Sequence, residues 1–128
     1  MKPPYGRITA IDLNSGEHLW MIPNGDTPES IKDHPALEGL EIGRTGKPTR
    51  AGILVTKTLV FAGEGAGGDS VLRAHDKSTG EILAEIDLPG SQTGLPMTYS
   101  LEGKQYIVVA VGGTSDRSAE LVALTLPD

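Results

Sequence analysis

The stretch LRAHDKSTGEILAEID, residues 72–87, repeats an earlier stretch of the chain, ITAIDLNSGEHLWMIP, residues 8–23. The two align without a gap at an offset of 64 residues, and ELVALTLPD near the C-terminus is a weaker third copy. In this third copy Ala123 stands where Ala74 stands in the second, 49 residues earlier. Repeats at spacings of about 40–50 residues are typical of β-propeller blades and similar arrays, and an insertion explains the longer spacing.

Each of the two strong copies predicts a β-hairpin. Residues 12–16 and 76–80 both begin with Asp and end with Ser or Thr followed by Gly. Glycine adopts the positive φ that a tight turn needs, and Asp, Ser and Thr side chains accept hydrogen bonds from nearby backbone N–H groups. After the second turn, apolar residues alternate over residues 82–88, which is the period of a strand.

Other apolar stretches extend these hairpins into blades. AGILVT and TLVFAG predict two strands before the second hairpin, so residues 51–88 are expected to form one complete four-stranded blade. Residues 5–23 are expected to form half of a preceding blade, and residues 95–126 a partial last blade. The all-apolar run IVVAV in the last blade predicts a strand buried on both faces. The predicted fold class is all-β, with antiparallel four-stranded blade units in a propeller fragment whose ring is incomplete.

Residues 24–50 differ from the rest, because Pro, Gly and charged residues follow one another at close intervals. This segment is expected to be a long loop insertion. Within it, TPESIKD predicts one helical turn, with Thr27 as its cap and Pro28 as its first residue. Residues 1–128 together are expected to be a single fragment of a propeller domain.

The composition excludes several classes of function. The net charge is −6 and the eleven Lys and Arg residues are scattered, so no nucleic-acid partner is expected. The chain has no cysteine, which excludes disulfides and thiolate chemistry. It contains no apolar run of transmembrane length and no targeting signal, so this segment is not expected to insert directly into a membrane.

The glycine-rich stretch GEGAGG, residues 63–68, matches the dinucleotide-binding pattern G-x-G-x-x-G, and Glu85 and Asp87 lie at about the distance of a ribose-binding acid. A dinucleotide site needs a helix directly after the glycines, because the helix N-terminus binds the pyrophosphate. SVLRAHD follows instead and has no helical pattern. A hairpin loop between two strands is therefore the favoured interpretation.

Candidate catalytic and metal-binding residues are sparse. No G-x-S-x-G motif is present, and no catalytic residue is assigned in this chain. His34 lies near Asp26, Glu29 and Asp33, but no pair of histidines has a metal-binding spacing. A solvated loop is therefore favoured there, and no metal ligand is assigned.

The first hairpin resembles a known repeat. The pattern A-x-D-x-x-(S/T)-G-x-x-x-W, filled by residues 10–20, resembles the tryptophan-docking repeat of quinoprotein dehydrogenases. The run LRAHDKSTGEILAEIDLPGSQTGLPMTYSLEGKQYIVVAVGG, residues 72–113, resembles the last blades of the membrane-bound glucose and polyol dehydrogenase branch of that family. Its most specific parts are LPMTY, residues 95–99, and GKQYIVVAVGG, residues 103–113. The resemblance implies an eight-bladed propeller that binds pyrroloquinoline quinone. Trp20 is expected to be a packing anchor between neighbouring blades, and the alternative is a cofactor platform.

The resemblance further implies a larger, periplasmic or exported parent that oxidises a sugar or polyol with pyrroloquinoline quinone and calcium. The calcium ligands, the catalytic Asp and a quinone-contacting Lys would come from other blades. This C-terminal segment is therefore expected to be inactive alone and to hold no cofactor by itself. Its expected partners are the remaining blades, and its exposed strand edges favour self-association. We also expect residues 7–22 to pair with residues 105–126.

The loops expected to face the quinone, by resemblance, are residues 47–52 and 91–98. Four residues are the candidate cofactor-binding residues: Arg50, Gly52, Gln92 and Thr98. An arginine can engage a carboxylate through two hydrogen bonds, and a glutamine can bond to a carbonyl. The alternative is that these polar residues only shape a loop at the end of the propeller.

A second interpretation is a non-enzymatic propeller, which serves as a scaffold or binding module without the quinone. Three departures from the family pattern favour it. Ala84 replaces the docking Trp in the second repeat, and Thr114 stands where family members commonly have His after the paired glycines. Residues 50–52 read Arg-Ala-Gly, where the family usually has Gly-Gly-Pro.

Overall fold

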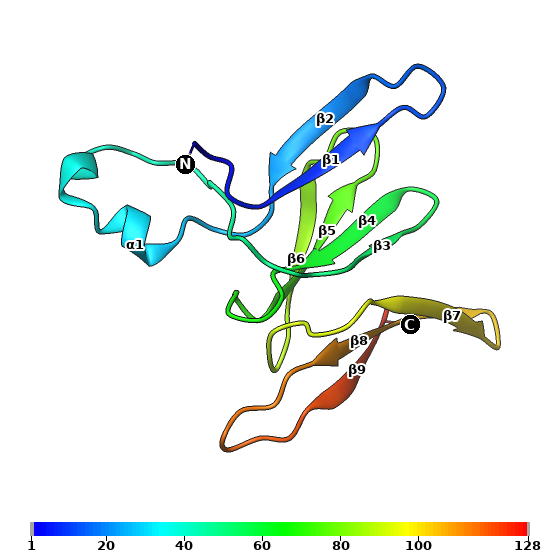
Figure 1. The fold of residues 1–128 in the computed structure, drawn as a ribbon. Coiled ribbons are helices and arrows are strands. Elements are labelled where there is room, and N and C mark those ends of the chain that lie inside the picture. Colours follow the sequence, from blue (N-terminus) through cyan, green and yellow to red (C-terminus); the bar gives the residue numbers. More distant parts are fainter. Residues whose placement is uncertain (1, 128) are drawn as a thin grey trace. The chain divides into compact units, whose positions relative to one another are not determined.

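The computed structural model describes residues 2–127 and consists mostly of antiparallel strands joined by loops (Figure 1). The strands are β1 (Arg7–Ile11), β2 (His18–Pro23), β3 (Ile53–Val55), β4 (Leu59–Gly63), β5 (Val71–Asp76), β6 (Ile82–Asp87), β7 (Met97–Leu101), β8 (Lys104–Val111) and β9 (Glu120–Thr125). One helical turn, α1 (Glu29–Lys32), and one 3-10 turn, η1 (Pro35–Leu37), lie between β2 and β3. The chain divides into two compact units, one up to Thr49 and one from Arg50 onward. The predicted all-β fold class is confirmed.

Asp12 builds the turn between β1 and β2. Its Oδ1 accepts hydrogen bonds from the N–H groups of Asn14 at 2.7 Å and Ser15 at 3.1 Å. The Ser15 hydroxyl in turn accepts one from the N–H of Glu17 at 3.2 Å. Gly16 has a φ of 75°, which glycine adopts without steric cost. These contacts close the antiparallel pair of β1 and β2.

The turn between β5 and β6 repeats these hydrogen bonds. Asp76 Oδ1 accepts from the N–H groups of Ser78 at 2.7 Å and Thr79 at 3.1 Å. The Thr79 hydroxyl accepts from the N–H of Glu81 at 3.2 Å, and Gly80 has a φ of 79°. The hairpins predicted from the sequence repeat are therefore confirmed.

Residues 24–50 fold around Thr27, whose side chain is buried. The Thr27 hydroxyl donates to the carbonyl of Gly43 at 2.9 Å and accepts from the N–H of Thr45 at 3.2 Å. The predicted helical turn is present as α1, but the predicted cap is wrong. The Thr27 hydroxyl bonds to Gly43 and Thr45 instead of to the helix. Pro28 stands at the cap position, where no side chain bonds to the helix.

The second unit contains two antiparallel sheets. β3, β4, β5 and β6 form a four-stranded meander in that order, and β7, β8 and β9 form a three-stranded one. Glu102 and Gly103 join β7 to β8 with φ values of 51° and 80°. Two consecutive residues with positive φ make a tight turn whose twist matches that of the paired strands.

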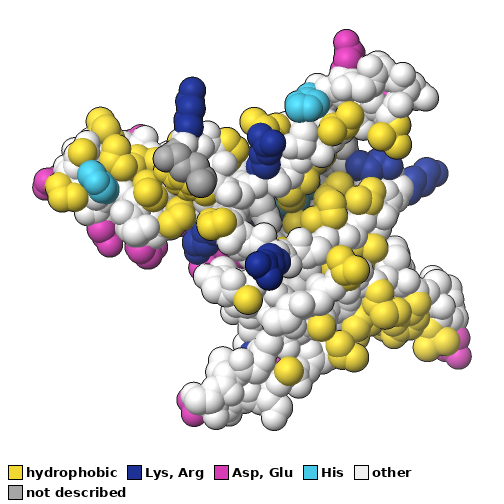
Figure 2. Space-filling view, viewed as in Figure 1, with side chains coloured by type: hydrophobic (Ala, Val, Ile, Leu, Met, Phe, Trp, Pro, Cys, Tyr) yellow, Lys and Arg dark blue, Asp and Glu magenta, His cyan; other side chains and the backbone are white. Residues whose placement is uncertain are grey.

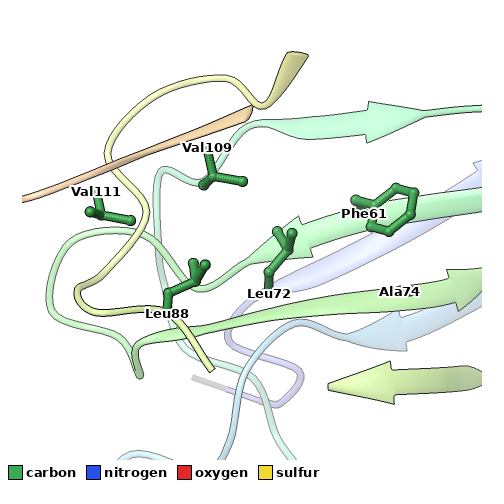
Figure 3. Packing of buried hydrophobic residues seen from close by; sticks show 6 residues of the cluster. All are labelled: Phe61, Leu72, Ala74, Leu88, Val109 and Val111. Atoms are coloured by element: carbon green, nitrogen blue, oxygen red, sulfur yellow. The ribbon is translucent and has the colours of Figure 1, made fainter. Parts of the chain in front are cut away.

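The core of the second unit lies between its two sheets (Figure 3). Six buried hydrophobic residues form it: Phe61, Leu72, Ala74, Leu88, Val109 and Val111. On β8, Val109 and Val111 are fully buried, whereas Val108 and Ala110 are only half-buried. The prediction that this strand is buried on both faces is therefore wrong for the described residues. The reason is that only one face of β8 meets the four-stranded sheet.

The opposite face of the three-stranded sheet is apolar and exposed. The strand register places Met97, Tyr99 and Leu101 on this face of β7, and they are 53%, 41% and 57% exposed. Figure 2 shows hydrophobic side chains gathered on the surface over β7. Tyr99 stacks on Tyr106 of β8, with ring centroids 5.1 Å apart and planes inclined by 11°. Leu121 of β9 extends the same face and is 74% exposed.

The strands form three separate hydrogen-bonded sheets. Within residues 2–127, β1 pairs only with β2, and β9 pairs only with β8. The expected pairing of residues 7–22 with residues 105–126 stays a prediction. A strand joined to its neighbour by a short turn pairs with that neighbour first, because a short loop loses little entropy on closing.

Among the described helices, none has the length and apolar character needed to cross a membrane.

Candidate functional site

The loops expected to face a cofactor meet at one end of the second unit. Because the strands alternate in direction, β3, β5, β7 and β9 begin at the end where β4, β6 and β8 finish (Figure 1). Four segments lie there: residues 50–52, 63–70, 88–96 and 112–119. We call these segments the loop face. The tight turns of the hairpins lie at the other end.

Gln92 lies at the centre of the loop face, and its side chain is fully buried. Its Oε1 accepts a hydrogen bond from the N–H of Gly63 at 2.8 Å. Its Nε2 donates to the carbonyl of Gly52 at 2.8 Å and to the carbonyl of Gly94 at 2.7 Å. The backbone of Gln92 forms a bridge to Val111 of β8. One side chain thus links the start of β3, the end of β4 and the connection into the three-stranded sheet.

Gly63 makes this contact possible because it has no side chain. A Cβ atom at this position would lie 2.4 Å from Oε1 and 3.0 Å from Cβ of Gln92. Real Cβ atoms do not approach other atoms so closely, so any larger residue would displace the glutamine. The glycine that opens the G-x-G-x-x-G pattern therefore serves the packing of Gln92.

A buried ion pair lies beside this junction. Arg73 donates from Nη1 to Oε1 of Glu64 at 2.6 Å and from Nε to Oε1 of Glu85 at 2.6 Å. The Glu64 side chain is completely buried, and its Oε2 accepts from the N–H of Asp69 at 2.9 Å. Burial lowers the pKa of Arg73, but the hydrogen bonds that Arg73 donates to Glu85 and Glu64 outweigh it and raise the pKa above its ordinary value.

These contacts confirm the hairpin interpretation of the glycine-rich stretch. Gly65 and Gly67 have φ values of 75° and 80°, and the chain enters β5 directly after the loop, without a helix. Glu85, one of the two candidate ribose-binding acids, is held by Arg73. Sequence reasoning missed this ion pair. The signal for it was the opposite charge of Arg73 and Glu85, which become direct cross-strand neighbours in the predicted hairpin.

Further hydrogen bonds join the remaining loops of the loop face. The Ser91 hydroxyl donates to the carbonyl of Gly68 at 3.0 Å, and the Ser91 carbonyl accepts from the N–H of Gly112 at 2.9 Å. Arg117 then donates from Nη2 to the carbonyl of Gly112 at 3.0 Å and from Nη1 to Glu120 at 2.5 Å. The loop face is therefore a connected network of hydrogen bonds.

The four candidate cofactor-binding residues are placed differently. Gly52 and Gln92 are in direct contact, as described above. Thr98 lies on exposed β7, where its hydroxyl donates to the carbonyl of Tyr106 at 2.8 Å and accepts from the amide of Gln105 at 2.9 Å. Arg50 is exposed and makes no hydrogen bond or ion pair with residues 2–127.

The exposure and hydrogen bonds of these four residues show which of them are able to bind a quinone that carries carboxylates. The guanidinium of Arg50 fits a carboxylate, since it is charged, exposed and not engaged within the described chain. The amide of Gln92 is buried against the backbone, and the Thr98 hydroxyl is bonded within its own sheet. Whether Arg50, Gly52, Gln92 and Thr98 touch a cofactor stays a prediction.

Two of the three histidines, His34 and His75, have local hydrogen-bonding roles. His34 accepts at Nδ1 from the N–H of Ala36 at 3.2 Å and so caps η1. His75 is buried on β5, with Nδ1 3.0 Å from the carbonyl oxygen of Gly80. Among residues 2–127, no group of three His, Cys, Asp or Glu side chains gathers in a way that could hold a metal ion.

The two repeats differ where the docking aromatic residue is expected. Trp20 on β2 lies opposite Ala10 on β1, and Ala84 on β6 lies opposite Ala74 on β5. The strand register is thus the same in both hairpins, but the aromatic side chain is present only in the first. The role of Trp20 as an anchor between blades stays a prediction.

Comparison with known protein families gives a match over most of the chain. The profile described as the PQQ "Glucose/ethanol/alcohol dehydrogenase, beta-propeller domain" matches residues 1–107. The glycerol dehydrogenase large subunit of Gluconobacter thailandicus is 37% identical over 99% of this chain and 17% of its own length. A probable quinate dehydrogenase (quinone) of Xanthomonas campestris pv. juglandis is 40% identical over 98% of this chain and 16% of its own length.

Two further matches agree with these. Quinoprotein glucose dehydrogenase of Escherichia coli (strain K12) is 33% identical over 99% of this chain and 16% of its own length. The crystal structure of quinohemoprotein alcohol dehydrogenase from Comamonas testosteroni superposes on 93% of this chain with a TM-score of 0.62, at 23% identity and over 16% of that chain. The chain therefore has the blade fold, and it spans about a sixth of the length of the relatives it matches.

Proposed function

Because this chain belongs to the β-propeller family of quinoprotein dehydrogenases that use pyrroloquinoline quinone, we propose that it is one segment of a sugar or polyol dehydrogenase. The match of residues 1–107 to the family profile carries this proposal. Relatives named for glycerol, glucose and quinate point to a substrate with several hydroxyl groups. We further propose that the parent is exported or periplasmic.

The segment contributes to the propeller wall and to one part of the cofactor site. Its length, about a sixth of the relatives, leaves the other blades to supply calcium ligands and catalytic groups. When bound, pyrroloquinoline quinone supplies two-electron oxidation chemistry. In this proposal Arg50 binds a carboxylate of the quinone through its guanidinium, and the loops held by Gln92 and Gly52 shape the surrounding surface. The segment alone is inactive.

The proposed partners of this segment are the remaining blades of the parent. The exposed apolar face of β7, β8 and β9 supports this, since Met97, Leu101 and Leu121 are more than half exposed. An apolar sheet face of this kind gains stability by packing against another apolar surface. In isolation, the same face and the unpaired edge of β9 favour self-association.

Reconstitution tests the enzymatic proposal. The full-length parent is mixed with pyrroloquinoline quinone and calcium, and dye-linked oxidation of glucose, glycerol and quinate is measured. We expect oxidation of at least one compound by the parent and none by residues 1–128 alone. An Arg50→Ala variant of the parent should bind the quinone about 10- to 100-fold more weakly, because a charged hydrogen-bonding pair is lost. A parent that binds no quinone contradicts the proposal.

A non-enzymatic propeller is the second candidate function. The observation that favours it is the second hairpin, where Ala84 occupies the position of Trp20 in an otherwise matching register. Thr114, in place of the family's common His, points the same way; in this structure its N–H donates to the carbonyl of Arg117 in a loop turn. A parent that folds as a propeller but fails to bind the quinone supports this candidate.

A further inference from the structure

We propose that Gln92 is a positioning residue of the loop face, which acts through the backbone of Gly52, Gly63 and Gly94 and leaves direct contact with the quinone to Arg50. The backbone part of this proposal rests on the structure of the second unit. The part that involves Arg50 rests on the proposed function.

The hydrogen-bonding groups of Gln92 are almost fully used. A glutamine amide has two N–H donors and an oxygen that can accept two hydrogen bonds. Both donors reach backbone carbonyls, at Gly52 and Gly94, and the oxygen accepts from Gly63. The side chain is only 1% exposed, so the remaining acceptor position has no access to a ligand.

The three partners also fix which way the amide points. Gly63 presents an N–H group, and Gly52 and Gly94 present carbonyl groups. Only an oxygen can meet the first and only an NH₂ group can meet the other two, so a flipped amide would break all three hydrogen bonds. A carboxylate of the same shape could satisfy Gly63 but would repel both carbonyls.

The hydrogen bonds of Gln92 affect Arg50 through the backbone that joins Arg50 to Gly52. Gly52, whose carbonyl is held by Gln92, lies two residues after Arg50 and directly before β3. A Cβ atom at Gly52 would lie 2.0 Å from Cδ2 of Leu95, so the loop that carries Gln92 also packs against this glycine. The backbone that presents Arg50 is therefore held to the loop after β6, and loss of that contact frees the segment to move.

Gln92→Glu in the full-length protein tests the backbone role. The readout is hydrogen exchange of the segment that contains the N–H of Gly63, taken as the ratio of variant to wild type at pH 5 and at pH 8. At pH 8 we expect exchange about 10-fold faster or more, because the ionised carboxyl faces two carbonyls without a donor. At pH 5 the ratio should fall severalfold, because burial raises the pKa of the introduced carboxyl and its protonated form can donate again.

Gln105→Glu is the matched control for the charge change. Gln105 lies on β8 and is exposed, and its side-chain amide donates to the hydroxyl of Thr98. Its variant should show the same exchange ratio near Gly63 at both pH values. The backbone role is overturned if the exchange ratio of Gln92→Glu is the same at both pH values, because simple loss of packing would not reverse on acidification. It is also overturned if this ratio equals that of the Gln105→Glu control.

Quinone affinity then tests the link to Arg50. Dissociation constants of pyrroloquinoline quinone are measured for the wild type, Arg50→Ala, Gln92→Glu and the double variant at pH 8. We expect each single variant to bind about 10-fold more weakly or worse, and the double variant to bind no more weakly than Arg50→Ala. Fully additive losses overturn the positioning role, because Gln92 would then contribute independently of Arg50. If the wild type binds no quinone, the proposed function fails, and the exchange ratio alone decides the role of Gln92.

Discussion

Arg73 donates a hydrogen bond to Glu64 over 2.6 Å, although both side chains are almost completely removed from water. The same guanidinium also pairs with Glu85, whose side chain is 44% exposed. One arginine therefore has a buried and a solvent-exposed carboxylate partner. The two partners should differ strongly in their effect on stability.

Removing the arginine should be costly. Arg73→Met leaves the carboxylate of Glu64 buried without its counter-charge, and we expect a loss of about 3–5 kcal/mol in the free energy of unfolding. Glu85→Gln removes only the exposed partner and should cost less than about 1 kcal/mol. Urea denaturation of the two variants checks the difference. Equal losses would mean that Glu64 is not buried as described.

Gly63→Ala should also destabilise the second unit. The new methyl group would collide with Gln92, and we expect a loss of about 1–3 kcal/mol. Gly43→Ala is a suitable control, since both glycines have φ values that alanine adopts and Gly43 has open space around its Cβ position. Urea denaturation should leave the control within about 0.5 kcal/mol of wild type. Similar losses in both variants would argue against the contact between Gly63 and Gln92.

The hairpin turns should make stability depend on pH. Hydrogen bonds from Ser78 lower the pKa of Asp76, and backbone N–H groups of Ser15 and Asn14 lower the pKa of Asp12. A carboxyl whose pKa is lower in the folded state stabilises the fold above its unfolded pKa, near 4, and loses this effect as the pH falls through the folded pKa.

Thermal unfolding between pH 2 and pH 6 measures this dependence. In the Asp76→Asn variant the melting temperature should fall less on acidification than in the wild type, because one titrating turn is removed. Replacing Asp12 as well should flatten the profile further. An unchanged acid profile in both variants would show that the turns do not contribute to it.

Self-association of the isolated chain should depend on the apolar face of β7 to β9. Sedimentation velocity at several concentrations is expected to show larger species for residues 1–128. Leu121→Lys places a charge on an exposed position of this face and should shift the distribution toward the monomer. Leu40→Lys, at an exposed apolar position outside the sheets, should leave it unchanged. If Leu121→Lys has no effect, this face is not the contact.

The sequence predicts the strands and turns of this chain well, because they depend on local signals. The Asp and Gly positions of the repeat set both hairpin turns, and alternation of apolar residues sets β6. Burial was harder to predict. The run around Val109 has apolar residues on both faces of β8. Within the described residues only one of these faces packs against another sheet, and no property of the run itself reveals which faces will be packed.

The candidate site was predicted only in part, for a related reason. The loops around Gly52 and Gln92 lie at one end of the strands, and Gly52 and Gln92 meet, whereas their contact with a cofactor stays a prediction. The partners of Gln92 and of Thr27, however, are backbone groups up to 40 residues away in the chain. Backbone N–H and carbonyl groups are the same in every residue, so nothing in the sequence identifies which of them a buried polar side chain will reach.

The glycine-rich stretch carries one more consequence. The negatively charged group held in this loop is not a ligand but the side chain of Glu64. The Glu64 carboxylate accepts the N–H of Asp69 and the guanidinium of Arg73, which are the kinds of donor that a nucleotide phosphate would use. A phosphate would have to displace the Glu64 carboxylate from these donors. Because Glu64 belongs to the same loop, its effective concentration at the donors is set by the loop and does not depend on the concentration of the protein.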